Sequence, residues 1–272
     1  MMDRRLTPAN GRVAALHLAG SVVADRYLEG WLMSVAVPVA DLHGAPDGAR
    51  DRQLLLGAAV TVFEDRDGWS FVQAADGYVG YLRSDLMWPA ADPTHFVATT
   101  ATHAYEAEDF KSRDLLHLPF GCRVTATAER RKFLETSYGF IPKKHLRPLD
   151  RPMADPVTVA QLHFGVPYLW GGNSTLGIDC SGLVSAGLRA CGIDCPADSD
   201  MQRDGLGLPF EGPYRRGDLI FWQGHVGMMV DAETLIHANA HHMAVAYEPI
   251  ETALTRIEVQ GGGAILAQRR LA

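Results

Sequence analysis

The sequence has 272 residues, of which 47% are hydrophobic and 21% charged, so it is long enough for two or three domains and has the composition of a globular protein. Its formal net charge is −7 and it has no run of basic residues, which argues against nucleic acid or an anionic membrane as a partner. No apolar stretch approaches the roughly 20 residues that a membrane-spanning helix needs. Composition therefore excludes a disordered chain and disfavours a membrane protein.

Residues 1–30 are predicted to form an N-terminal arm and not a cleaved signal peptide. Their apolar run from Val13 to Val23 is short, is interrupted by His17 and lacks a convincing cleavage site. The chain has four cysteines without the spacing of a disulfide framework, which is more typical of a reducing compartment. We therefore expect the protein in the cytoplasm.

Two β-rich segments, residues 31–90 and 91–149, follow the arm and resemble each other. In both, short predicted strands alternate with turns that contain glycine and aspartate. The stretch LPFGCRVTATAE in the second corresponds to LLLGAAVTVFED in the first, and KFLETSYGFIP corresponds to WSFVQAADGYVGYL. This internal repeat predicts two small β-barrels, which serve either to bind and position peptides or only as structural spacers.

Residues 150–272 are predicted to form an α+β domain, in which helices precede a run of antiparallel strands. Asp155 and Pro156 are a typical N-cap and first-turn pair for one helix. A second helix is predicted to begin at Cys180, because the apolar residues that follow recur on one helical face. Gly192 stands where the left-handed conformation that ends a helix is expected. Strands are expected at 218–222, 225–231 and 234–240.

Cys180 is the candidate nucleophile. Its place in the first turn of a helix brings the sulfur close to free backbone N–H groups and to the positive end of the helix dipole, which both favour a thiolate. Several glycines leave room beside the sulfur, and Asp179 and Ser181 flank it with polar groups, whereas a purely structural cysteine favours an apolar setting. The other three cysteines lack this setting and are expected to be structural.

Two histidines on neighbouring predicted strands are candidates for the base and for the group that orients it. His225 opens a strand, and imidazole can take a proton from a thiol and return it to a leaving amine. His237 on the next strand is the candidate orienting group, with Asn239 as the alternative. The two histidines can cooperate only if the connection between their strands is odd in length or contains a bulge, because an even loop puts them on opposite faces.

His241 and His242 follow His237 closely, so these three histidines are either metal ligands or solvent-facing residues. No HExxH motif and no paired CxxC pattern accompanies them. We therefore expect neither a metal site nor another cofactor.

Five short motifs, PYLWGG, DCSGL, GDLIFW, HVGMMV and LIHA, occur in an order and at a spacing that closely resemble the NlpC/p60 cysteine peptidases, which hydrolyse cell-wall peptides. The resemblance covers about residues 152–272 and implies a papain-like catalytic domain. It also implies that Cys180 is the nucleophile, His225 the base and His237 the orienting residue.

The same resemblance implies a set of substrate-binding residues. Tyr168 and Trp170 would line the site, with the Tyr168 hydroxyl near the oxyanion. The other matching positions flank the nucleophile or lie in the loop after its helix: Asp179, Ser181, Asp198 and Ser199. Asp198 or Ser199 is alternatively the cap of a helix that starts near Met201.

The two β-rich segments resemble bacterial SH3-like domains, the first more closely than the second. With them, the whole chain resembles the γ-D-glutamyl-L-diamino-acid dipeptidyl peptidases of murein-peptide recycling. In that branch the first SH3-like domain is implied to cover the cleft and to restrict it to peptides with a free N-terminal L-alanine. Tyr78 and Asp51 best match the tyrosine and the acid that would meet the amine, although Asp51, between Arg50 and Arg52, equally suits a solvated surface turn.

The predicted function is thus hydrolysis of the bond between γ-D-glutamate and a diamino acid, meso-diaminopimelate or lysine, in a murein tripeptide or a related cell-wall peptide. The alternatives are a general cell-wall endopeptidase, an acyltransferase that uses the same thioester, and an inactive peptide-binding module of the same fold. Cys180, His225 and His237 together argue against the inactive module, because an inert copy has no need to keep all three.

Overall fold

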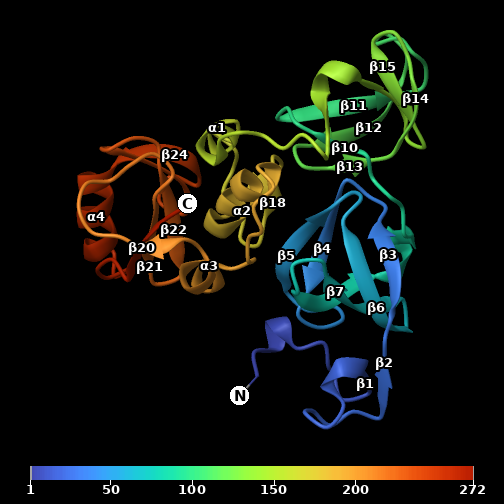
Figure 1. The fold of residues 1–272 in the computed structure, drawn as a ribbon, viewed down its shortest axis with the longest axis horizontal. Helices are drawn as coiled ribbons and strands as arrows, with labels where there is room; N and C mark the ends of the chain where they lie inside the picture. The colour runs from blue at the N-terminus through green and yellow to red at the C-terminus, as the bar shows by residue number, and fades with distance from the viewer. Residues whose placement is uncertain (1, 272) are drawn as a thin grey trace. The chain divides into compact units, whose positions relative to one another are not determined.

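The structure is a computed structural model that describes residues 2–271 (Figure 1). It divides into two compact units, Met1–Leu149 and Asp150–Ala272. The N-terminal unit is built from strands and short 3-10 turns, whereas the C-terminal unit combines helices with a largely antiparallel sheet. The α+β class predicted from the sequence is therefore confirmed.

The first large sheet of the N-terminal unit has seven strands in the order β5-β4-β8-β7-β6-β3-β9. The strands are β3 Trp31–Val35, β4 Val39–His43, β5 Arg50–Leu55, β6 Ala59–Arg66, β7 Trp69–Ala74, β8 Val79–Arg83 and β9 Met87–Pro89. Because β5 and β9 are its edges, the sheet is not a closed barrel. Strand β9 ends at Pro89, which has no N–H to donate to a further strand.

The N-terminal arm contributes to the core of this sheet. Its strands β1 (Val13–Ala15) and β2 (Arg26–Leu28) pair in parallel, and two residues of β1 are buried against Phe63 and Phe71. The arm also contains the 3-10 turns η1 (Arg4–Leu6) and η2 (Leu16–Leu18). The beginning of the short apolar run, Val13–Ala15, therefore packs into the first unit, whereas Leu16 and Val23 are exposed.

The rest of the N-terminal unit forms a five-stranded sheet, β12-β11-β16-β15-β14, and a three-stranded sheet, β13-β10-β17. The strands are β10 His95–Val97, β11 Ala101–Tyr105, β12 Asp114–Pro119, β13 Arg123–Val124, β14 Ala126–Glu129, β15 Phe133–Thr136, β16 Gly139–Pro142 and β17 Leu146–Pro148.

The internal repeat in the sequence corresponds to a repeated path of the chain. The aligned stretches LLLG and LPFG end at Gly57 and Gly121, whose φ angles of 77° and 85° favour glycine. The 3-10 turns η3 (Ser84–Leu86) and η4 (Lys143–His145) each precede the last short strand of their segment. Both segments therefore turn and end in the same way.

The main sheet of the C-terminal unit has the order β20-β25-β21-β22-β23-β24, and β18 and β19 form a separate hairpin. Its helices are α1 Pro156–Gln161, α2 Cys180–Ala190, α3 Ser199–Gly205 and α4 Ile250–Val259. Its strands are β18 Asn173–Ser174, β19 Gly177–Ile178, β20 Leu208–Pro209, β21 Leu219–Trp222, β22 His225–Met229, β23 Thr234–Asn239, β24 Ala244–Pro249 and β25 Ala267–Arg270. No helix among residues 2–271 is long and apolar enough to cross a membrane.

Helix ends in this unit follow the local sequence signals. Asp155 caps α1 by accepting a hydrogen bond from the N–H of Val157, and Pro156 occupies the first turn. Helix α2 ends just before Gly192, whose φ is 74°. These signals therefore predicted both ends correctly.

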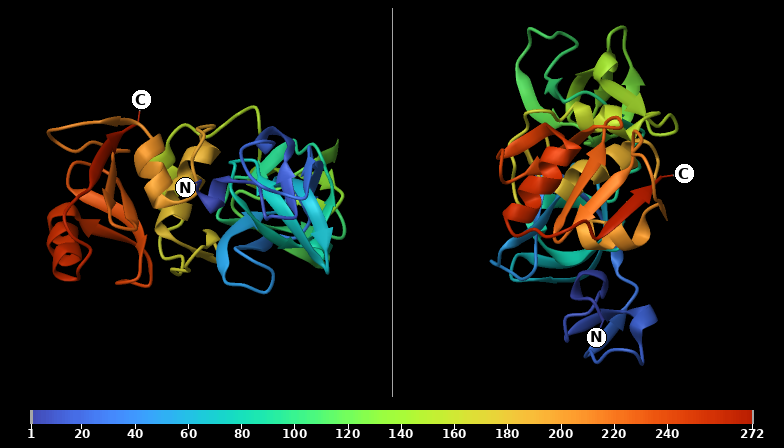
Figure 2. Two further views of the ribbon diagram at one scale, coloured as in Figure 1. Left: turned by 90° about the horizontal axis from the view of Figure 1, so that it is seen from below. Right: turned by 90° about the vertical axis from the view of Figure 1, so that its left-hand side faces the viewer.

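Alternate residues of the central strands face two different clusters. Val226, Met228 and Ile236 pack with the apolar face of α2, whereas Met229 and Leu235 pack with α4. Figure 1 and the left view of Figure 2 show the strands between these two helices. This arrangement covers both faces of the sheet and fixes the start of α2 against β22.

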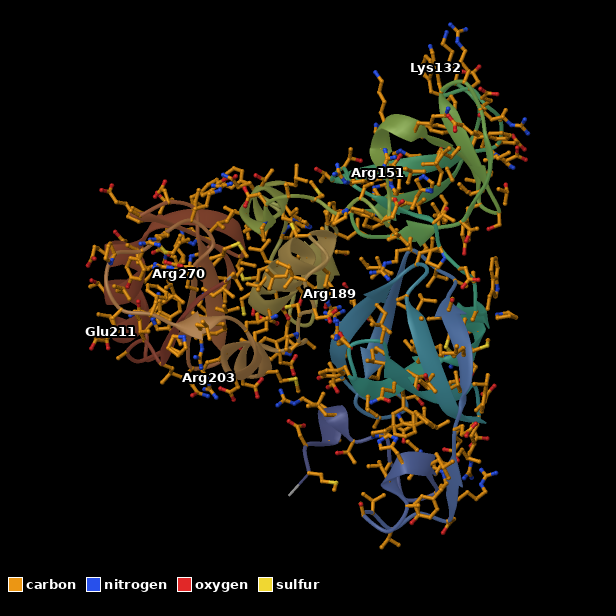
Figure 3. The ribbon with its side chains drawn as sticks, viewed as in Figure 1. Lys132, Arg151, Arg189, Arg203, Glu211 and Arg270 are labelled. Atoms are coloured by element: carbon orange, nitrogen blue, oxygen red, sulfur yellow. The ribbon has the colours of Figure 1, made fainter. Side chains whose placement is uncertain are left out.

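Asp218 holds the C-terminal strand β25 to the start of β21. Its side chain is 1% exposed and accepts hydrogen bonds from Arg270 Nε at 2.7 Å, Arg270 Nη2 at 2.6 Å and the Arg215 N–H at 2.7 Å. Arg270 is labelled in Figure 3. The ion pair therefore ties together segments that are far apart in the sequence.

We expect Asp218→Ala to lower the free energy of unfolding by about 2 to 3 kcal/mol. This is less than the loss for a fully buried pair, because Arg270 is 27% exposed. Urea unfolding monitored by tryptophan fluorescence measures the change. Glu258→Ala, at an exposed position of α4, is the control and should change stability by less than about 0.5 kcal/mol. Equal stability of the two variants would contradict the prediction.

Candidate active site

Cys180 is the first residue of α2, and its side chain belongs to the core cluster of the C-terminal unit. The backbone N–H groups of Val226, Ser181 and Cys180 itself lie near the sulfur and lower the pKa of the thiol. Because Val226 directly follows His225, the sulfur lies beside the beginning of β22. The fold thus brings together the two segments that carry the predicted nucleophile and base.

The surroundings of Cys180 strongly disfavour ionisation of its thiol. Burial and, to a lesser extent, the Asp179 carboxylate raise its pKa to about 12, although the three N–H groups lower it. In the resting site, removal of the sulfur from water therefore outweighs the effect of the helix end, although the N–H groups act in the direction that the sequence predicts. A protonated thiol needs a base at the moment of attack.

His225 and His237 hydrogen-bond to each other, with 2.9 Å between His225 Nε2 and His237 Nδ1. The last paired residues of their strands are Met229 and Leu235, so residues 230–234 connect the strands. This connection has an odd length of five, as cooperation of the two histidines requires. Burial and, next, His237 lower the pKa of His225 to about 3, so its imidazole is neutral at pH 7 and can accept a proton.

Glu248 is a member of the site that sequence reasoning missed. Its Oε2 lies 3.0 Å from His237 Nε2, and Arg256 of α4 donates to both carboxylate oxygens, at 2.9 and 2.8 Å. Burial alone would raise the pKa of Glu248, but the hydrogen bonds from Arg256 and His237 bring it well below its usual range. The sequence analysis did not predict strand β24, so it gave no reason to place Glu248 beside His237.

Tyr168 lies near Cys180, as the sequence motif implies. Its backbone N–H donates to the carbonyl of Met243 at 2.9 Å, and it pairs with Ile178 just before the nucleophile. Burial and then the charges of Cys180 and Asp179 raise its pKa to about 12, so the phenol keeps its proton and can donate a hydrogen bond. Trp170, two residues on, is 70% exposed.

Asp179 caps α2 and braces the preceding loop. One carboxylate oxygen accepts hydrogen bonds from the Gly182 N–H at 2.7 Å and the Ser181 hydroxyl at 3.0 Å, and the other accepts from the Gly171 N–H at 2.9 Å. Both carboxylate oxygens of Asp179 thus accept hydrogen bonds from groups of the protein itself. Asp179 is therefore the N-cap of α2, and Ser181 is one of its hydrogen-bond donors.

Asp198 and Ser199 lie at the beginning of α3. The helix starts at Ser199, so the prediction of a start near Met201 was two residues late, and Asp198 occupies the N-cap position without a side-chain capping bond. Burial and, less strongly, the charge of Asp198 raise the pKa of Asp179. Asp198 is therefore close enough to the nucleophile loop to influence it electrostatically.

The two residues predicted to meet the substrate amine belong to the N-terminal unit. Asp51 lies in β5, so the surface-turn interpretation was wrong, and its carboxylate accepts a hydrogen bond from Arg4 Nη2 at 2.8 Å. Tyr78 is 3% exposed, and the guanidinium carbon of Arg52 lies 5.3 Å from the centre of its ring. Asp51 and Tyr78 both interact electrostatically with Arg4 and therefore share one cluster.

His237, His242 and Glu248 offer ligand atoms within 4.8 Å of one another. Two of these residues already take part in the hydrogen bonds described above, and Arg256 places a positive charge on both oxygens of Glu248. A metal ion would have to compete with that guanidinium. Asn239, the alternative orienting group, accepts hydrogen bonds from the N–H and Nδ1 of His242 at 2.8 and 3.0 Å. We therefore interpret this group as a hydrogen-bond network.

Two parts of the chain match known protein families. Residues 165–259 match the NlpC/P60 family, and residues 42–86 match the bacterial dipeptidyl-peptidase SH3 domain. A gamma-D-glutamyl-L-lysine dipeptidyl-peptidase of Bacillus cereus (strain ATCC 10987 / NRS 248) is 28% identical over 238 residues, which cover 74% of this chain and 71% of the relative. A protein of the same name from Bacillus subtilis (strain 168) is 25% identical over 221 residues, which cover 71% of this chain and 73% of the relative.

A solved structure of an NlpC/P60 family protein from Bacillus cereus ATCC 10987 has the same fold. It superposes with a TM-score of 0.73 at 21% sequence identity and covers 88% of this chain and 99% of that chain. The chain therefore carries an NlpC/P60 domain preceded by a bacterial SH3 domain, as its motifs predicted, and it is a cysteine peptidase.

Proposed function

We propose that the protein hydrolyses the bond between γ-D-glutamate and an L-diamino acid in short cell-wall peptides that carry a free N-terminal L-alanine, as a step of cell-wall recycling. The observation that carries the proposal is the hydrogen-bonded pair His225–His237 in the unit that places Cys180 at the start of α2. The names of the two Bacillus relatives support the γ-D-glutamyl specificity.

In the proposed reaction, the sulfur of Cys180 attacks the side-chain carbonyl carbon of γ-D-glutamate while His225 takes the thiol proton. The phenol of Tyr168 donates a hydrogen bond to the oxygen that becomes negative. The C–N bond then breaks, and His225 gives its proton to the amine of the departing diamino acid. Water resolves the thioester through the same base, which releases the dipeptide and restores the thiol.

The requirement for a free amine is assigned to Asp51 and Tyr78. A carboxylate and a phenol are suitable partners for an ammonium group, and a hydrogen bond between charged groups is about twice as strong as a neutral one. Acetylation of the peptide removes this charge and adds bulk. The first SH3-like domain would thereby select recycled peptides over wall polymer.

We expect the wild-type protein to cleave L-Ala-γ-D-Glu-meso-diaminopimelate with a kcat/KM about 30-fold to 1,000-fold higher than the N-acetylated peptide, equivalent to about 2 to 4 kcal/mol. Mass spectrometry of the products measures both rates. The lysine analogue, run in parallel, decides which diamino acid is preferred.

Tyr78→Phe and Asp51→Asn should reduce this preference while the Cys180 chemistry continues. Asp85→Asn, at an exposed position of the same SH3-like domain, is the matched control and should preserve the preference. Equal rates for free and acetylated peptide in the wild type would contradict the role of this domain.

A general cell-wall endopeptidase is the second candidate, and the ion pair of Asp51 with Arg4 favours it, because this carboxylate already has a cationic partner. The same assay separates the two functions. A general endopeptidase would cleave acetylated peptide and intact wall fragments as fast as the free tripeptide.

A further inference from the structure

We propose that Glu248 and Arg256 are positioning residues that fix the tautomers of both histidines, so that Nδ1 of His225 is the unprotonated nitrogen that receives the proton of Cys180. This inference rests on the proposed function for its catalytic consequence. The tautomers themselves are a property of the protein without substrate.

The chain of hydrogen bonds begins at an ion pair in the interior. The side chains of Glu248 and Arg256 are 6% and 15% exposed, and the guanidinium donates to both oxygens of the carboxylate. Such a paired, buried carboxylate is ionised and can only accept hydrogen bonds. The 3.0 Å contact between Glu248 and His237 therefore requires the proton on Nε2 of His237.

The first tautomer determines the second. His237 is fully buried, and burial lowers its pKa, so the ring carries one proton, and with that proton on Nε2 its Nδ1 is an acceptor. His225 must then donate from Nε2 across the 2.9 Å contact. Its other nitrogen, Nδ1, keeps a lone pair and is the free base.

The packing of α4 and β24 holds this series of hydrogen bonds in place. Arg256 projects from α4, whose residues Ile250, Ala253 and Ile257 are buried against the sheet. Glu248 precedes the helix in β24 and pairs with Leu235, two residues before His237 on the neighbouring strand. Both ends of the ion pair are thus attached to elements that share a core with the strands of the two histidines.

Nitrogen-15 NMR of protein labelled at histidine tests the inference directly. In the wild type we expect a protonated Nε2 and an unprotonated Nδ1 for both His225 and His237, because side-chain nitrogen shifts differ between the two states. His225→Gln and His237→Gln serve only to assign the signals. A protonated Nδ1 on His225 in the wild type would overturn the proposal, whatever the activity.

Two variants of Glu248 add a kinetic test. Glu248→Gln keeps an acceptor oxygen for His237 Nε2, so it should preserve the tautomers and keep kcat within about 10-fold of the wild type. Glu248→Met has a similar shape without an acceptor. It should mix the tautomers and lower kcat about 10-fold to 100-fold, on the magnitude for a buried donor left without a partner, with little change in KM.

Glu251→Met, at an exposed position in the first turn of α4, is the matched control and should leave kcat unchanged. Wild-type kcat and tautomers in Glu248→Met would overturn the proposal. If that variant does not fold, the wild-type spectrum still decides. Correct tautomers in a protein that does not cleave γ-D-glutamyl peptides would refute the proposed function and leave this inference standing.

Discussion

Replacement of Cys180 by alanine or serine is expected to abolish peptide hydrolysis and to change the melting temperature by only a few degrees. Without the thiol no thioester can form, and loss of a nucleophile that works with a base lowers kcat by roughly 10⁵-fold to 10⁶-fold. The effect on folding is small because sulfur and oxygen differ little in size and the alanine variant removes a single buried atom. Cleavage of the free tripeptide and thermal unfolding measure the two effects.

Cys191→Ala is the matched control for this experiment, because Cys191 lies at the other end of α2, at its C-cap. It should keep full activity. Substantial turnover by Cys180→Ala would show that the nucleophile is another residue. Loss of activity in both variants would instead point to damage of the helix.

Local signals in the sequence were enough to place Cys180 at the start of a helix. The Asp155–Pro156 pair and Gly192 mark helix ends through backbone conformations that only a few residue types satisfy, and the structure has those ends. The parity rule for antiparallel strands likewise stated the condition under which His225 and His237 can meet, and the five-residue connection fulfils it. Each of these inferences needs only short stretches of chain.

The parts that could not be predicted depend on tertiary structure. Glu248 reaches His237 only through the register of β23 with β24, and Arg256 reaches Glu248 only once α4 packs on the sheet. The pKa of Cys180 is set mainly by burial, which a helix N-terminus in the sequence does not reveal. The pairing of Arg4 with Asp51 joins residues 47 positions apart.

His225→Ala should lower kcat by about 10⁴-fold to 10⁶-fold, the range for removal of a general base that acts with its nucleophile. The loss is large because the resting thiol is protonated, and the variant lacks the imidazole that takes its proton. His237→Ala should cost less, about 10-fold to 1,000-fold, because water can occupy the vacated space and partly orient His225. Single-turnover cleavage of the free tripeptide measures both losses on one scale.

His241→Ala is the control for these two variants, because His241 is exposed and lies in the same histidine-rich turn. It should keep wild-type activity. If His237→Ala lost more activity than His225→Ala, the roles of the two histidines would be exchanged, and His237 would be the base. The order expected here follows from the hydrogen-bond partners. Both nitrogens of His237 have partners, His225 and Glu248, whereas the contact with His237 occupies Nε2 of His225 and, in the proposed tautomer, leaves its Nδ1 as the acceptor.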